Sequence, residues 1–148
     1  MQKVTYNNLF DTFSMIASNH YQINSFEFGE AWDINSSGTT NYPLLLVIPE
    51  TSTVSIGKVT YKFKLAVMDL VQKGKDNDID VESDTHQILL DVIAELRMGG
   101  YDFSVDRNLT ITLEQFSEKF DDEVTGWWGD IILDTDFDFD SCNIPTIN

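Results

Sequence analysis

Four aspartates that alternate along one short segment are the residues of this chain whose types and spacing most suggest chemistry. The segment LDTDFDFDS spans residues 133–141, and its carboxylates belong to Asp134, Asp136, Asp138 and Asp140. Clustered carboxylates can hold a calcium ion or act in catalysis. An EF-hand loop starting at Asp134, however, needs Gly at position six and Glu at position twelve, where this chain has Phe139 and Pro145. The segment therefore does not match an EF-hand calcium site.

The spacing of two residues is typical of a β-strand instead. Every second side chain of a strand points to the same face, so neighbouring carboxylates stand about 6.6 Å apart. At that distance two charges repel by about 0.6 kcal/mol in water and by about 2.5 kcal/mol at an effective dielectric constant near 20. The segment thus predicts one charged strand face, backed by Phe137 and Phe139. That face must meet solvent or an opposite charge.

Charge is distributed unevenly along the sequence. The chain has 25 acidic and nine basic residues, a formal net charge of −16. Five of the nine bases lie between positions 58 and 75, whereas positions 121–140 contain eight acids and no base. Two such patches could pair between copies of the chain, head to tail, and close into a ring. They could equally neutralise each other within one sheet, and the sequence does not separate these alternatives.

These patterns nominate two sets of site residues. The candidate subunit interface consists of Lys58, Lys62, Lys64 and one of two adjacent tryptophans, Trp128. The acidic face, which would line a lumen or pair with those lysines, consists of Asp130, Asp134, Asp136, Asp138 and Asp140. Buried aromatic side chains often anchor interfaces, which is why Trp128 is included.

The other chemically reactive residues form no recognisable site. Cys142, His20 and His86 are the only thiol and imidazoles, and no pattern around them would activate a nucleophile. The Walker A, dinucleotide-binding and Cys-x-x-Cys motifs are missing from the sequence. We therefore expect a protein that is not an enzyme and that binds no cofactor and no metal.

Composition narrows the classes of protein to which this chain could belong. A net charge of −16 opposes the lysine and arginine contacts by which proteins hold DNA phosphates, and it would also repel an anionic membrane. A single cysteine forms no internal disulfide and suits a reducing cytoplasm. Neither a secretory signal nor an apolar window of about 18 residues is found, so we expect no membrane association.

Hydrophobic periodicity predicts a domain with both helices and strands. Apolar residues at helical spacing predict one helix from about Thr5 to His20 and a second that starts at an Asp84 N-cap and ends at Gly99-Gly100. Strands are predicted at 44–48, closed by Pro49, at Val59–Val67, at Leu109–Leu113 and from Trp127 onward. The element order predicts one α+β domain, 1–148, in which two helices pack on one face of an antiparallel sheet.

Several segments together resemble a known group of virion proteins. They are Tyr42-Pro43-Leu44-Leu45-Leu46-Val47, the strand Val59–Val67, ESDTHQILLDVIAEL (82–96), FDDEVTGWWGDIIL (120–133) and Cys142-Asn143-Ile144-Pro145. The chain resembles bacteriophage tail-completion or tail-terminator proteins and related neck-ring (head–tail connector) proteins. The similarity follows the element order over most of the chain, through motifs that are short and apolar. The aspartate run is not one of the motifs that carry it.

The resemblance implies a small subunit that forms a homo-oligomeric ring in the virion neck or tail and is assembled in the cytoplasm of the bacterial host. Such a ring contacts other neck, tail and portal proteins and leaves a channel through which DNA passes without specific binding. Neither catalytic residues nor a cofactor is implied. Two alternatives from the residues remain: an acidic DNA mimic that inhibits a nucleic-acid-binding protein, and a metal-dependent hydrolase that uses the aspartates. The first predicts salt-sensitive binding of a basic partner, and the second predicts tight binding of a divalent metal.

Overall fold

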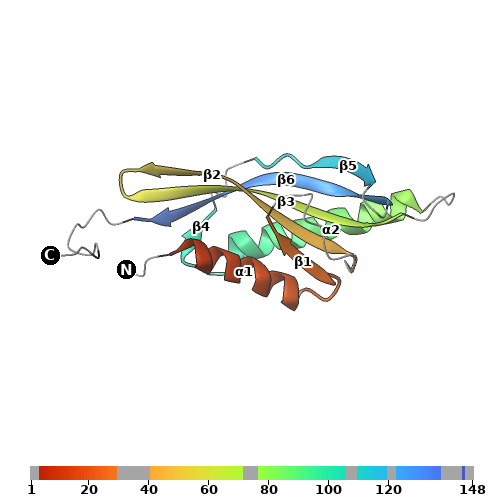
Figure 1. The fold of residues 1–148 in the computed structure, drawn as a ribbon, viewed down its shortest axis with the longest axis horizontal. Helices are drawn as coiled ribbons and strands as arrows, with labels where there is room; N and C mark the ends of the chain where they lie inside the picture. The colour runs from red at the N-terminus through yellow and green to blue at the C-terminus, as the bar shows by residue number, and fades with distance from the viewer. Residues whose placement is uncertain are drawn as a thin grey trace.

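In the residues that it describes, the structure, a computed structural model, combines a six-stranded mixed sheet with two helices. It describes residues 4–29, 41–71, 77–105, 110–119, 123–137 and 145. Figure 1 shows the two helices lying along the same side of long, twisted strands. The expected α+β class is confirmed.

Helix α1 (Tyr6–Asn19) begins and ends within one residue of its predicted bounds. Its start is a capping box: the Thr5 hydroxyl accepts the Asn8 backbone N–H at 3.2 Å, and the Asn8 side chain accepts the Thr5 N–H at 2.8 Å. These bonds satisfy backbone donors that a helix end leaves without partners. The face that includes Leu9 and Phe13 is buried against the sheet.

Helix α2 (Asp78–Met98) begins six residues before the predicted cap, so that part of the prediction is wrong. Asp84 lies inside the helix, and the N-cap is Asn77, whose side chain makes no capping bond. The early start is favoured because Val81 already belongs to the buried stripe, while acidic side chains in the first turn suit the positive end of the helix dipole. The predicted end is confirmed, with the Gly99 N–H bonded to the Glu95 carbonyl.

Six strands form the sheet in the order β1-β2-β3-β6-β4, with β5 also paired to β6. Their bounds are β1 (Ser25–Phe28), β2 (Leu44–Ser55), β3 (Lys58–Leu70), β4 (Phe103–Ser104), β5 (Glu114–Lys119) and β6 (Glu123–Asp136). The sheet is not purely antiparallel as predicted, because β1 runs parallel to β2. A parallel neighbour needs a long connection, and the 15 residues from 29 to 43 provide one.

Two strand predictions need correction. Strand β2 does not end at Pro49 but runs on to Ser55, with a register shift between Pro49 and Thr51. Proline is tolerated there because the pairing with β1 stops at Val47, so its missing N–H lies on a strand with one open side. The strand predicted at Leu109–Leu113 is also displaced: residues 110–113 are not in a strand, β5 starts at Glu114, and Leu109 lies outside the described residues.

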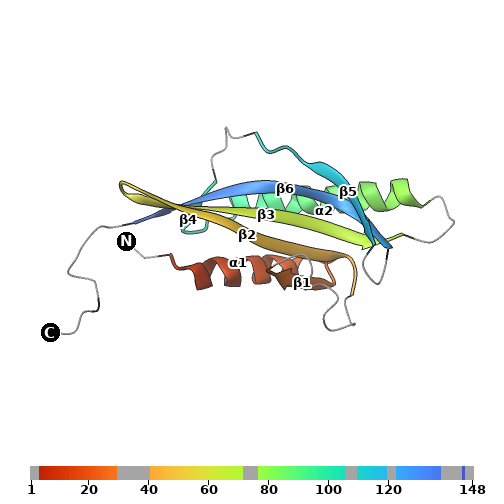
Figure 2. The same ribbon diagram turned by 45° about the horizontal axis from the view of Figure 1, so that its top comes forward.

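Both helices pack on one face of the sheet, as predicted. This face holds the larger core, which α1 and α2 share with β2, β3 and β6 (Figure 2). Its strand residues include Leu45, Val47, Phe63, Leu65, Val67, Ile131 and Leu133. The opposite side of the sheet, called the outer face below, has a smaller apolar cluster around Leu46, Met68 and Phe116. Neither described helix is long and apolar enough to span a bilayer.

Candidate functional site

The predicted basic and acidic residues come together on the outer face, because β3 and β6 are antiparallel neighbours. Register places Lys58 opposite Asp136 and Lys64 opposite Asp130. The residues of β6 alternate as predicted, with Ile131, Leu133 and Thr135 buried and the aspartates on the other side. Asp138 and Asp140 lie outside the described residues.

Lys62 lies between two carboxylates of its own chain. Its Nζ is 3.7 Å from an oxygen of Asp130 on β6 and 3.9 Å from an oxygen of Glu50 on β2. A hydrogen bond with Asp130, then burial and the Asp130 charge, raise the pKa of Glu50 above its ordinary value, although Lys62 and Lys64 oppose the shift. The sequence left open whether the basic and acidic residues pair between copies or within one sheet. Lys62 and Asp130 pair within one sheet. Glu50 went unpredicted because Pro49 was expected to end its strand.

The other members of the acidic face differ in how they are bonded. The Thr60 hydroxyl donates to Asp134 at 2.6 Å, which anchors that carboxylate across the strand pair. Lys58 and Asp136 are both exposed, and no ion pair within the described part of the chain involves either residue. The acidic face is therefore not uniform. Asp130 and Asp134 are bonded to β3 side chains, whereas Asp136, the last residue of β6, is exposed.

Trp128 is held within its own subunit. Its ring stacks on Phe116 with centroids 4.5 Å apart, and Lys64 Nζ lies 4.9 Å from the ring centre. The indole N–H points to Glu114 at 3.5 Å. Trp127 faces the helices instead, and its indole N–H donates to the Glu82 carbonyl at 2.9 Å. Two of the predicted interface residues, Lys64 and Trp128, thus form an intramolecular cation–π pair.

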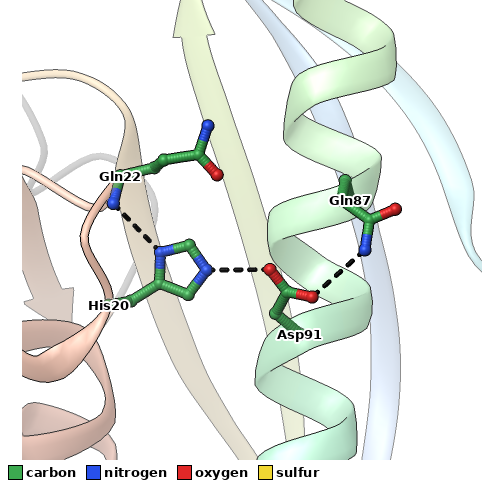
Figure 3. A network of polar contacts seen from close by, with 4 residues as sticks. All are labelled: His20, Gln22, Gln87 and Asp91. Carbon is green, nitrogen blue, oxygen red and sulfur yellow. Dashed lines mark hydrogen bonds and ion pairs between the residues drawn. The ribbon is translucent and has the colours of Figure 1, made fainter.

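A second polar cluster joins the end of α1 to α2 (Figure 3). His20 Nε2 lies 3.0 Å from Asp91 Oδ2, and the other Asp91 oxygen accepts the Gln87 amide at 3.1 Å. The bond to His20, followed by the bond to Gln87, holds the pKa of Asp91 below its ordinary value although partial burial opposes the shift. The sequence does not reveal this pair, since its members are 71 residues apart.

A His–Asp pair invites comparison with catalytic dyads, but the imidazole here has no basic nitrogen to offer. The backbone N–H of Gln22 donates to His20 Nδ1 at 3.1 Å, which leaves the proton on Nε2, facing Asp91 (Figure 3). A general base needs an unoccupied ring nitrogen within reach of substrate. We interpret this cluster as a tie between the two helices. His86 likewise packs edge-on against Trp127, and Cys142 lies outside the described residues.

A groove runs between the first turns of α1 and the segment that follows α2. It encloses about 400 Å³ and is called the α1 groove below. Its lining residues are Val4, Asn8, Asp11, Thr12, Met15, Gly100, Tyr101, Asp102 and Phe103. Among the described residues, no group of three or more side chains is arranged to hold a metal ion.

The β2–β3 hairpin carries a surface feature that the sequence interpretation missed. Both views show it projecting past the start of α1 (Figures 1 and 2). At its end Ile56 is 98% exposed and Val54 is 61% exposed, while Gly57 makes the turn with φ +78°. The predicted strand ended at Pro49 and the next one began at Val59, so the sequence interpretation assigned no strand to Val54 and Ile56. The signal was present in the sequence as Val54 and Ile56 directly before Gly57, a residue type that favours a tight hairpin turn.

Comparisons of the sequence with protein-family models and with curated proteins find no match.

Proposed function

We propose that this chain is a structural subunit of a bacteriophage virion that assembles with copies of itself into a ring of the tail-terminator or neck-ring kind. The observation that carries the proposal is the projecting β2–β3 hairpin, whose end presents Val54 and Ile56 to solvent. The α+β fold, with helices on one face of the sheet, agrees with the class of subunit that the sequence resembles.

Exposed aliphatic side chains at the end of a hairpin are available for association. Burying one Ile or Val is worth about 1.5–3 kcal/mol. In the free subunit Ile56, which is 98% exposed, gains almost none of this, and Val54, which is 61% exposed, gains only part of it. A projecting hairpin also reaches beyond its own core, so it can contact a neighbour without disturbing the fold. This geometry suits a head-to-tail contact, which closes into a ring when the rotation between copies permits.

The charge pattern supports roles for the other surfaces of the subunit. Lys62 and Asp130 already pair within the subunit, and so do Lys64 and Trp128. Among the predicted interface lysines, Lys58 then remains to make contacts between copies. The surplus of acid, which includes Asp136, would repel DNA phosphates inside a channel, so DNA passes without specific binding. The partners above and below would be other neck, tail or portal proteins of the virion.

The geometry of the outer face supports the DNA-mimic alternative less well than it supports a ring subunit. A mimic needs a continuous row of carboxylates in place of phosphates, whereas here Lys58, Lys62 and Lys64 on β3 lie beside the β6 aspartates. The neighbouring lysines reduce the negative potential that would attract a DNA-binding protein.

Native mass spectrometry of the purified chain, with and without neck or tail partners, tests the proposal. We expect one closed oligomer of defined copy number, or incorporation into particles where neighbouring rings provide a template. A chain that stays monomeric at all concentrations and never enters particles contradicts the proposal.

The channel role is tested separately in assembled particles. We expect Asp136→Lys to slow DNA ejection while particle assembly stays normal, because a cation on the wall would bind phosphate. Asp80→Lys, which makes the same charge change on the exposed side of α2, is the matched control and should leave ejection unchanged. Equal ejection rates in both variants exclude the acidic lining.

A further inference from the structure

The end of the β2–β3 hairpin combines an apolar side chain with a nearby cation. Ile56 is 98% exposed, so it touches nothing in its own subunit, its own α1 groove included. Lys58 follows two residues later and is also exposed, without an ion pair to any described residue. Gly57 between them adopts a left-handed φ of +78°, which gives the turn its tight form. This tip therefore presents an aliphatic side chain and one exposed lysine, which lies opposite Asp136 in the strand register.

The α1 groove has the complementary character. Val4, Met15 and Phe103 supply apolar surface along its lining. Two exposed carboxylates, Asp11 on α1 and Asp102 after α2, belong to the same lining and have no ion pair to a described residue. An apolar pocket edged with acid favours an aliphatic side chain accompanied by a cation.

Each copy of the chain thus contains both a tip and a matching groove that its own tip does not fill. We propose that Ile56 of one copy inserts into the α1 groove of a second copy, where Lys58 pairs with Asp11 and Asp102. The inference rests on the proposed self-assembly and names the contact that produces it. Because tip and groove are different surfaces, the contact can repeat from copy to copy.

Two substitutions of exposed isoleucines separate this contact from general surface effects. Ile56→Asp should leave the fold intact, because the side chain is solvated, but should weaken self-association about tenfold or more, as expected when an apolar anchor becomes charged. The matched control is Ile79→Asp on α2, where the side chain is 76% exposed. It should leave association unchanged. Circular dichroism and sedimentation analysis measure fold and association.

A charge exchange identifies the partner residues. Lys58→Glu alone should weaken association, because it places a carboxylate against Asp11 and Asp102. Adding Asp102→Lys in the same chain should restore most of the lost affinity, since the pair is then re-formed with reversed sign. No recovery in the double variant argues against this pairing.

Disulfide cross-linking locates the contact directly. With Cys142→Ser as background, one batch carries Ile56→Cys and a second, of different tagged mass, carries Met15→Cys. Mixing under oxidising conditions should give a disulfide between the two masses, whereas Ile79→Cys mixed with Met15→Cys should give none.

The outcomes separate the inference from the proposed function. If the wild-type chain forms a ring, but Ile56→Asp has no effect and no cross-link forms, the tip-in-groove contact is wrong while the ring proposal stands. If the wild-type chain is monomeric under every condition and no cross-link forms, both fail.

Discussion

Replacing Lys62 by methionine removes the cation that neutralises two neighbouring carboxylates on the outer face. Its Nζ is 3.7 Å from Asp130 and 3.9 Å from Glu50. Methionine keeps the unbranched apolar stem, so the change chiefly concerns charge. After the substitution, Glu50 and Asp130 are left facing each other across β3.

The expected magnitude follows from these distances. At the dielectric constant of water each contact is worth about 1 kcal/mol. Ordering a lysine side chain costs up to about 2 kcal/mol, and exposed pairs contribute only about 0.2–1 kcal/mol each. The repulsion between the two remaining carboxylates adds to the loss. We therefore expect Lys62→Met to lower the free energy of unfolding by about 1 kcal/mol at neutral pH and low salt.

Urea unfolding followed by tryptophan fluorescence measures this loss, at a protein concentration low enough to prevent self-association. Lys58→Met is the matched control. It makes the same chemical change on the same strand and face, at a lysine with no ion pair in the described residues. The control should change the unfolding free energy by less than about 0.5 kcal/mol. In about 1 M salt the deficit of Lys62→Met should fall to roughly half or less.

The loss of unfolding free energy in Lys62→Met also depends on pH. The pKa of Glu50 is raised in the folded protein, so the folded state takes up this proton more readily and Glu50 favours folding at low pH. That contribution is lost as pH rises past the raised pKa, and the loss is larger when Lys62, which opposes the shift, is absent. The deficit of Lys62→Met should therefore be largest at neutral pH and shrink in acid. Equal deficits in the two methionine variants, or a deficit that salt and acid leave unchanged, would refute this reasoning.

Other substitutions test the fold at single positions. The bond from His20 lowers the pKa of Asp91 in the folded protein. Asp91 therefore contributes stability that is present above its ordinary pKa of 3.8 and is lost as pH falls below it. In Asp91→Asn, the free energy of unfolding measured from about pH 6 to about pH 2 should fall less with acid than in the wild type. Leu89→Ala should cost about 2–5 kcal/mol in urea unfolding, whereas Leu90→Ala, at a side chain 40% exposed, should cost clearly less. Gly126→Ala should destabilise by about 2 kcal/mol or more in thermal unfolding, because a Cβ there would overlap the backbone of β3, and a stable variant would contradict that close approach.

Local patterns were enough to predict the elements whose burial repeats regularly. The apolar stripe around Leu9 and Phe13 predicted α1, and strict alternation predicted the β3 strand and the placement of the β6 aspartates on the face opposite the core. These features depend on neighbours one to four residues away, which the sequence displays directly. The same reasoning failed at Pro49 and at Asp84. Proline is accepted in β2 only because β1 is short, and the start of α2 depends on Val81 reaching the core.

The sequence by itself determined that an α+β fold would expose a surplus of acid and that one strand face would carry its aspartates two residues apart. Only the tertiary structure decided what those charges meet. Strand pairing brings Lys62 beside Asp130, and helix packing brings His20 to Asp91. It also leaves Ile56, at the turn between β2 and β3, in solvent. Such contacts join residues far apart in the chain, so they arise only once the core has set the register and position of each element.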